Sequence, residues 1–159
     1  MQKVYSIILF FAFCLCSANA EDTIKKKIIA STEIIRVEEG GIDFKARVDT
    51  GAETCSIHAL DIEVDPSDDS KNQMISFRIV NKAGKSKAVK TRVASVVNIR
   101  TSEGSERRYK VPLTLGLGRF KKTVLVTLND RSRMTYGLLL GRNWLSGDFL
   151  VDVDLENTN

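Results

Sequence analysis

Apolar and polar residues alternate, at least in part, through most of the chain after residue 30. This pattern is typical of half-buried β-strands. The runs are rich in β-branched and aromatic residues and span residues 33–39, 42–49, 56–64, 75–80, 88–100, 107–117 and 121–130. Only residues 141–147, GRNWLSG, favour a short helix.

Turn-forming residues separate these runs. Gly40-Gly41 and the polar segments 65–70, 81–87 and 102–106 lie between predicted strands. Short strands at regular spacing with Gly-containing turns indicate a closed or sandwiched domain. We therefore predict an all-β fold, with one short C-terminal helix. The polar tips at 81–87 and 102–106 each predict a long hairpin, which is either a solvated arm or a flap over a groove.

The first twenty residues have the three parts of a secretory signal peptide. Lys3 precedes an apolar stretch over residues 4–16, and Ala18-Asn19-Ala20 has the small residues of a cleavage site. A membrane anchor is the alternative, but a span needs about 20 apolar residues. A lipoprotein modified at Cys14 or Cys16 is a further alternative, although bulky residues precede both cysteines. We expect cleavage after Ala20 and a periplasmic or secreted protein.

The mature chain is then expected to form one domain. We assign residues 21–33 to an N-terminal extension or strand, 34–155 to the domain and 156–159 to a tail. Loss of the signal leaves Cys55 as the one cysteine, so no intramolecular disulfide can form.

Charge gives little indication of a nucleic-acid partner. Of 24 basic residues, Lys3 leaves with the signal, and the remaining 23 face 20 acidic residues. The dense basic stretches, 24–29 and 82–90, resemble solvated strand edges, where Lys discourages edge pairing. We expect no nucleic-acid partner and no membrane span after the signal.

The catalytic inventory of residues 21–159 is small. It holds one histidine, His58, and one cysteine, Cys55. HExxH, G-x-S-x-G, a Walker loop and G-x-G-x-x-G are all absent from the sequence. Cys55 and His58 lie three apart in a predicted strand, which points them to opposite faces. We therefore expect no metal and no cofactor, and Cys55 to be a small buried side chain.

Carboxylates remain as candidate catalytic groups, and the segment RVDTGAETCS (47–56) contains one, Asp49, in a distinctive motif. Asp49 directly follows a predicted core strand. Thr50 offers a hydroxyl, Gly51 permits close backbone approach, and Ala52 keeps the wall small for an extended peptide. The motif alone occurs often by chance, but a second block, YGLLLGRNWL (136–145), places two leucines, Gly141, Arg142 and Asn143 before the helix.

Together the two blocks resemble the retropepsin-like aspartic proteases. The similarity is closer to a bacterial family labelled ATP-dependent zinc proteases, whose members have D-T-G-A-x-T-S-S-L-H-A and later T-D-R-S-x-M and L-L-G-R. It runs from about Ile34 to Asp154. The chain departs from the family at Cys55, usually serine, and at Gly137, often proline.

The resemblance implies a retropepsin-like closed β-barrel and an aspartic endopeptidase. Because the chain has one D-T-G, it also implies a homodimer in which each copy contributes Asp49. Thr50 would lock the two loops together, and Gly51 would contact the substrate main chain. The 81–87 hairpin is our flap candidate.

The resemblance further implies a brace behind the active-site loop. Arg142, following Gly141 and preceding Asn143, would form a bidentate ion pair with Glu53. Asp130 and Arg131 belong to the family pattern as well. We expect them to form a structural turn or to contact the substrate.

Family members often occur with amide-ligase-like and transglutaminase-like proteins. This implies a peptide or protein substrate and cleavage of a peptide, glutamyl or isopeptide-type amide bond. Two alternatives stay open. One is a non-catalytic β-domain that binds peptides or a partner, and the other is the zinc-dependent hydrolase of the family label.

Overall fold

A computed structural model describes residues 25–65, 73–101 and 104–155. The expected signal peptide and the tail at 156–159 lie outside the described residues. The elements, in chain order, are β1 (Lys27–Ile29), β2 (Thr32–Val37), β3 (Ile42–Val48), β4 (Cys55–Val64), β5 (Met74–Val80), β6 (Ser86–Arg92), β7 (Ser95–Thr101), β8 (Gly104–Leu117), β9 (Phe120–Asn129), β10 (Leu138–Leu140), α1 (Arg142–Leu145) and β11 (Phe149–Val151).

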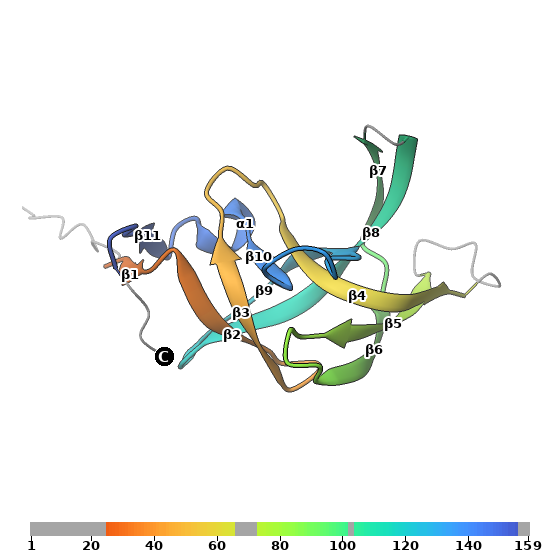
Figure 1. The fold of residues 1–159 in the computed structure, drawn as a ribbon, viewed down its shortest axis with the longest axis horizontal. Coiled ribbons are helices and arrows are strands. Elements are labelled where there is room, and N and C mark those ends of the chain that lie inside the picture. Colours follow the sequence, from red (N-terminus) through yellow and green to blue (C-terminus); the bar gives the residue numbers. More distant parts are fainter. Residues whose placement is uncertain (1–24, 66–72, 102–103, 156–159) are drawn as a thin grey trace, which may run out of the picture.

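Six strands close into a mixed barrel, in the order β10-β3-β2-β8-β9-β4 (Figure 1). β10 closes it, because this short strand pairs parallel with β3 and antiparallel with β4. β4 also pairs parallel with β9, whereas the remaining neighbours are antiparallel. The prediction of a closed β-barrel with one short helix near its C-terminus is confirmed.

The alternating pattern of the sequence becomes an inside and an outside of the barrel. Along β3, buried and exposed residues alternate without exception. Phe44 from β3, Ile35 from β2 and Ile57 from β4 point into one core, each 1% exposed or less. Burial of such side chains contributes about 1.5–3 kcal/mol each.

The predicted strand at 88–100 is broken in the structure. Val93 donates its N–H to Gln73 O and Ala94 donates to Lys110 O. The chain thus leaves the β5–β6 hairpin, which extends β4, and joins β8 as β7. Partner exchange between two sheets breaks the strand, and alternation within the run itself gives no sign of it.

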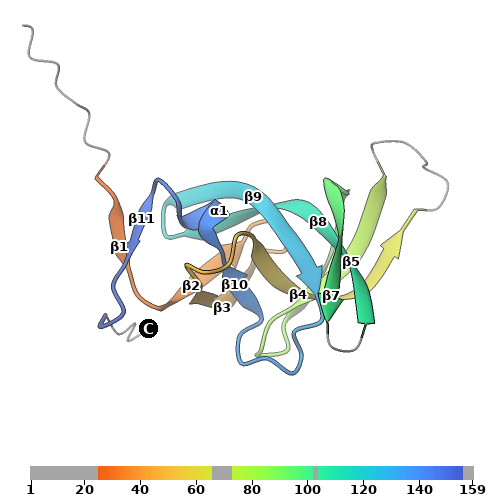
Figure 2. The same cartoon turned by 90° about the horizontal axis from the view of Figure 1, so that it is seen from above.

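Three three-residue strands, β1, β10 and β11, are too short to show a periodicity. β1 lies within the expected N-terminal extension and pairs parallel with β11. The two form a small sheet at one end of the molecule, and the β5–β6 and β7–β8 hairpins lie at the other end (Figure 2). Among the described residues, no helix is long and apolar enough to cross a membrane.

The short helix closes the barrel core from one side. Trp144 is fully buried, and its indole Nε1 donates to Leu115 O at 3.3 Å. The Trp144 ring stacks on Phe149 at a centroid distance of 4.4 Å and meets Phe120 edge-on. Lys122 Nζ donates to the carbonyl oxygens of Trp144 and Ser146 at the C-terminal end of the helix, where carbonyl groups lack an intrahelical partner.

Replacing Trp144 by Ala is expected to lower the free energy of unfolding by about 3–5 kcal/mol, because it removes a large buried ring and leaves a cavity. Urea denaturation measures this change. Ile34→Ala is the control, since Ile34 lies on the outer face of β2 and is 41% exposed. Equal losses in the two variants would contradict the packing role of Trp144.

Candidate active site

The loop at residues 49–54 connects β3 to β4 and presents Asp49 at one end of the barrel. Asp49 directly follows β3, and its N–H donates to Leu140 O at 3.0 Å. Because β10 pairs parallel with β3, this bond extends the ladder by one residue beyond Val48. The two sequence blocks that carried the resemblance therefore meet in space.

The Asp49 carboxylate is fixed by the loop that follows it. Oδ1 accepts the N–H groups of Gly51 at 2.9 Å and Ala52 at 3.1 Å. Asx turns of this kind fold the backbone over the side chain. Oδ2 has no hydrogen bond within the part of the chain that the structure describes, and Asp49 is half-buried. One oxygen is held in place and the other stays available.

Gly141 lets the chain before α1 cross directly against this loop. A Cβ at residue 141 would lie 2.6 Å from the carbonyl carbon of Thr54 and 2.9 Å from its nitrogen. Real Cβ atoms do not approach backbone so closely, so only glycine fits. Two backbone hydrogen bonds hold the crossing together. The Arg142 N–H donates to Ala52 O at 2.8 Å, and the Asn143 N–H donates to Glu53 O at 3.1 Å.

The side chain of Arg142 contacts the loop, although through other atoms than predicted. Its Nη1 donates to Gly51 O at 2.6 Å and to Thr50 O at 3.2 Å. No ion pair joins it to Glu53 among the described residues, and both side chains are exposed. Residues 50 and 51 turn their carbonyl oxygens toward α1. The Arg142 guanidinium therefore donates to these backbone oxygens in place of the Glu53 carboxylate.

Asn143 joins the helix to two strands. Its Oδ1 accepts the Cys55 N–H at 3.0 Å, and its Nδ2 donates to Leu125 O at 2.8 Å. Cys55 is fully buried, and its Sγ accepts the Gly141 N–H at 3.3 Å. Burial raises the pKa of this thiol to about 11. Cys55 is thus a buried packing side chain, protonated at neutral pH.

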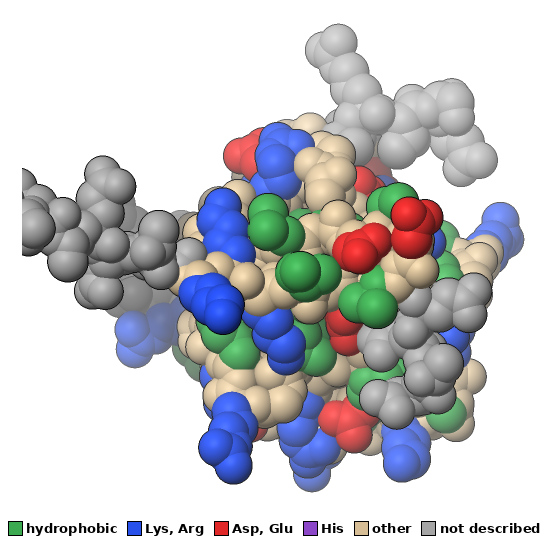
Figure 3. All heavy atoms as spheres, turned by 90° about the vertical axis from the view of Figure 1, so that its left-hand side faces the viewer, with side chains coloured by type: hydrophobic (Ala, Val, Ile, Leu, Met, Phe, Trp, Pro, Cys, Tyr) green, Lys and Arg blue, Asp and Glu red, His purple; other side chains and the backbone are tan. Residues whose placement is uncertain are grey.

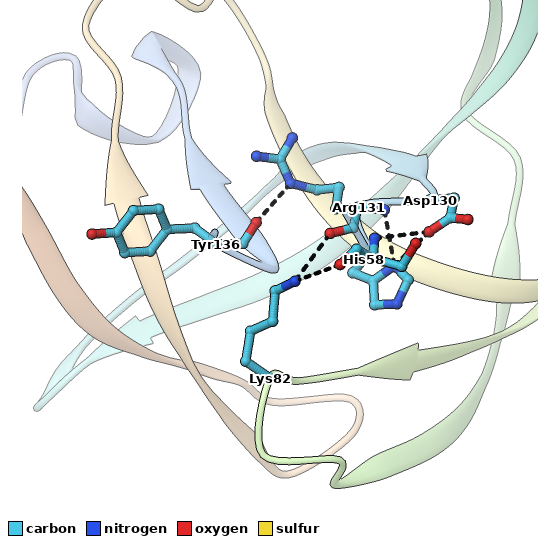
Figure 4. Close-up of polar contacts among 6 residues, drawn as sticks. His58, Lys82, Asp130, Arg131 and Tyr136 are labelled. Carbon is cyan, nitrogen blue, oxygen red and sulfur yellow. Dashed lines mark hydrogen bonds and ion pairs between the residues drawn. The ribbon is translucent and has the colours of Figure 1, made fainter. Parts of the chain in front are cut away.

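Asp130 and Arg131 form a turn built around the one histidine (Figure 4). The buried His58 accepts the Arg131 N–H on Nδ1 at 3.0 Å, and Asp130 Oδ1 lies 3.5 Å from the same nitrogen. Asp130 Oδ1 also accepts the Ser132 N–H, which lowers the pKa of this carboxyl. His58 thus supports the turn through an Nδ1 that accepts a backbone N–H.

The 81–87 hairpin, our flap candidate, is fastened to the barrel. Lys82 Nζ donates to Ser132 O at 2.9 Å, and Asn81 Nδ2 donates to Asp43 O at 2.9 Å. The hairpin that borders a hollow beside the Asp49 loop is β7–β8, which contributes Val97 and Arg108 to its wall.

This hollow has a volume of about 410 Å³ and reaches the loop at Ala52 and Thr54. Its basic lining residues are Arg108, Lys110 and Arg131. Sequence analysis missed Arg108 and Lys110, whose only signal was their spacing of two along one strand, which puts them on one face. Within the described ranges, no group of three or more His, Cys, Asp or Glu side chains could hold a metal ion.

The chain is similar to a known protein family and to a solved structure. The sequence model of the RimB-like family, described as retropepsin-like aspartic endopeptidase RimB, matches residues 28–159. A protein of unknown function from Legionella pneumophila, Lpg0085 (DUF785), has a similar crystal structure. The TM-score is 0.71 and the identity 27%, over 84% of this chain and 98% of that one.

Longer relatives match as well. Probable alpha-L-glutamate ligases from Shewanella pealeana and Desulfotalea psychrophila are 36% and 33% identical to this chain. The matches cover 80% and 84% of the chain. It spans only 28–29% of the length of these relatives.

Gly141→Ala is expected to destabilise the protein by at least about 1–3 kcal/mol, because the new Cβ must push the Thr54 backbone away. Thermal unfolding checks this expectation. Ser146→Ala, at an exposed position just after α1, should change stability by no more than about 0.5 kcal/mol. A fully stable Gly141→Ala protein would contradict the described crossing.

Proposed function

The chain belongs to the RimB-like family of retropepsin-like aspartic endopeptidases, and on this premise we propose that it hydrolyses amide bonds with Asp49. The bond is a peptide bond or a glutamyl or isopeptide-type amide bond. The observation that supports this most is the Asp49 carboxylate, which is oriented by two N–H groups on a loop braced by Arg142.

Hydrolysis of this kind needs two carboxylates that share one proton across a water molecule. One carboxylate takes a proton from the water, while the other, protonated, donates to the carbonyl oxygen of the scissile bond. The water oxygen then bonds to the carbonyl carbon, and the amine leaves with a proton. Asp49 supplies one carboxylate, and the loop amides keep its geometry constant through these steps.

A second copy of the chain would supply the other carboxylate. The chain has a single D-T-G, so a two-fold axis beside the loop would bring Asp49 and its equivalent together. Thr50 is exposed at the tip of the loop, where its partner's Thr50 could meet it. Arg142 supports this tip from behind, through the carbonyl oxygens of Thr50 and Gly51.

An exposed apolar surface lies where this second copy would dock. Ile28 and Leu150 are register partners in the β1–β11 sheet, and they are 56% and 53% exposed. Leu150, Thr50 and Arg142 line one shared hollow. Figure 3 faces this side of the molecule and shows hydrophobic side chains near its centre, with basic side chains to the left and below and acidic side chains mainly to the right. Exposed apolar patches of this kind commonly mark protein interfaces.

The relatives suggest the chemistry of the substrate. They are named probable alpha-L-glutamate ligases, and this chain matches one part of them. A ligase of that name forms amide bonds to glutamate, so a hydrolase associated with it would cleave such bonds. We propose an amide ligase as a functional partner. Export by the expected signal peptide stays part of the proposal.

Asp49→Asn is expected to abolish cleavage while the fold survives, because the amide oxygen can still accept the Gly51 and Ala52 N–H groups. Purified residues 21–159 would be tested on a peptide library at pH 4 to 7. Asp43→Asn is the matched control, because Asp43 lies on β3, the strand that Asp49 follows, at an exposed position paired with Arg36. Cleavage that persists in Asp49→Asn would refute the proposal.

A mixing experiment tests the shared site. After subunit exchange, an equal amount of Asp49→Asn protein should lower wild-type activity to about half, because mixed dimers have only one intact aspartate. Unchanged activity on mixing would show that a single chain is sufficient. Peptide binding without cleavage by a folded wild type would favour the non-catalytic binding domain.

Leu150→Glu is expected to weaken dimerisation at least about tenfold, since it places a charge in the apolar surface. Light scattering over a dilution series measures this, and activity should fall with the dimer fraction. Ile34→Glu changes an apolar residue of similar exposure on β2 and should leave the dimer intact. An active, dimeric Leu150→Glu protein would place the interface elsewhere.

A further inference from the structure

The strand β6 forms a free edge of the main sheet. The strand order ends at β6, which pairs with β5 alone among the described strands. It lies along the lower margin of the molecule in Figure 1. The backbone N–H and C=O groups on the outer side of an edge strand can pair with a strand of another chain. The edge of β6 therefore has the backbone groups that an interaction with a further strand needs.

The register with β5 identifies which residues of β6 have outward backbone groups. Asn81 donates its N–H to Lys85 O at 2.9 Å, so these two residues form a hydrogen-bonded pair. Hydrogen-bonded and non-hydrogen-bonded pairs alternate in an antiparallel ladder. The odd-numbered residues of β6 therefore bond to β5, and the even-numbered residues turn their N–H and C=O groups outward. The outward residues are Ser86, Ala88, Lys90 and Arg92.

This edge lacks most of the features that keep edge strands from pairing. All seven residues of β6 pair with β5 in one unbroken register, and the strand contains no proline. Each of the four outward residues is exposed, so no described element covers them. Bulges, proline, a covering element and charge are the usual protections of an edge strand. Only charge protects β6.

The charge of the segment is entirely positive. Residues 82–92 contain five basic residues and no acidic residue. Lys90 lines a small hollow together with Glu63 and Asp65, which reduces the positive charge there but leaves the segment with an excess. Like charges on facing strands destabilise their pairing, and opposite charges stabilise it. The basic residues thus oppose the addition of a second copy of β6 and favour an acidic strand.

The hairpin that carries β6 is held in place before any partner binds. Asn81 Oδ1 accepts the N–H groups of Ala83 and Lys85, each at 3.0 Å, which shapes the turn. Lys82 Nζ donates to the carbonyl oxygens of Arg131 and Ser132 at the barrel (Figure 4). A preformed edge lowers the entropy cost of binding, because less of the protein has to become ordered.

From these observations we propose that β6 is a docking edge for a partner protein, which adds an extended acidic segment as a further strand of the sheet. The outward N–H and C=O groups would supply the main-chain hydrogen bonds. Lys87, Lys90 and Arg92 would select carboxylate side chains. Strand addition of this kind takes its affinity from main-chain bonds and its specificity from side chains.

The docking edge is separate from the candidate active site. No residue of β6 lines the described hollows that border the Asp49 loop. The inference therefore does not depend on cleavage by Asp49, and its test needs no substrate.

An extended segment fits this edge better than an anionic surface does. A lipid bilayer with anionic headgroups would use the charges and leave the outward backbone groups in water. These groups lie in the plane of the sheet and alternate along β6, so another strand in register can bond to all of them.

Hydrogen exchange measured by NMR tests the docking edge residue by residue. The Asp49→Asn protein would be saturated with an acetylated octapeptide of alternating glutamate and threonine. We expect the amides of the four outward residues to exchange at least about tenfold more slowly, because they gain hydrogen bonds. The amides of residues 87, 89 and 91, which already bond to β5, should change less than about twofold.

The double variant Lys90→Gln/Arg92→Gln should weaken peptide binding at least about tenfold, since it removes two charges from the edge. Lys45→Gln/Arg47→Gln is the matched control, because it removes two charges at the same spacing from the exposed face of β3. Ala88→Pro should prevent binding although every charge remains, since proline removes an outward N–H that β5 does not use. Thermal unfolding of each variant separates lost binding from lost folding.

Three results would overturn the inference. The first is equal affinity for a peptide of alternating glutamine and threonine, and the second is an equal loss of binding in the β3 double variant. The third is peptide binding that leaves the exchange of the four outward amides unchanged. Adsorption to phosphatidylglycerol vesicles together with that third result would assign the charges of β6 to a membrane surface.

Discussion

The candidate site depends on one close backbone crossing. Gly141 passes against Thr54 at a distance that leaves no space for a side chain. This crossing brings β10 between β3 and β4, which closes the barrel, and it places α1 behind the Asp49 loop. The barrel closure and the orientation of Asp49 are therefore consequences of the same contact.

Around this crossing, polar side chains hold the neighbouring backbone in place through hydrogen bonds. Asn143 links α1 to the start of β4 and to the middle of β9. Arg142 donates to two carbonyl oxygens of the Asp49 loop. The bonds from Arg142, and the bond from Asn143 to β4, join segments about 90 residues apart in the chain. A loop held in this way keeps its carboxylate in one geometry, which is what catalysis by positioned groups requires.

The two sides of the loop differ in their chemistry. One side, with Leu150, is apolar and exposed, and suits a second copy of the chain. The other side is the hollow of about 410 Å³ whose basic lining residues are Arg108, Lys110 and Arg131.

The alternation of residues by itself determined five of the six barrel strands, β2, β3, β4, β8 and β9, because burial on one face imposes a period of two. The D-T-G-A and L-L-G-R-N blocks likewise located the loop and the helix behind it. Only the tertiary structure decided which atoms Arg142 contacts, where the strand at 88–100 breaks, and that Arg108, Lys110 and Arg131 share one hollow. These features join segments distant in the chain, and no local pattern encodes the geometry that brings such segments together.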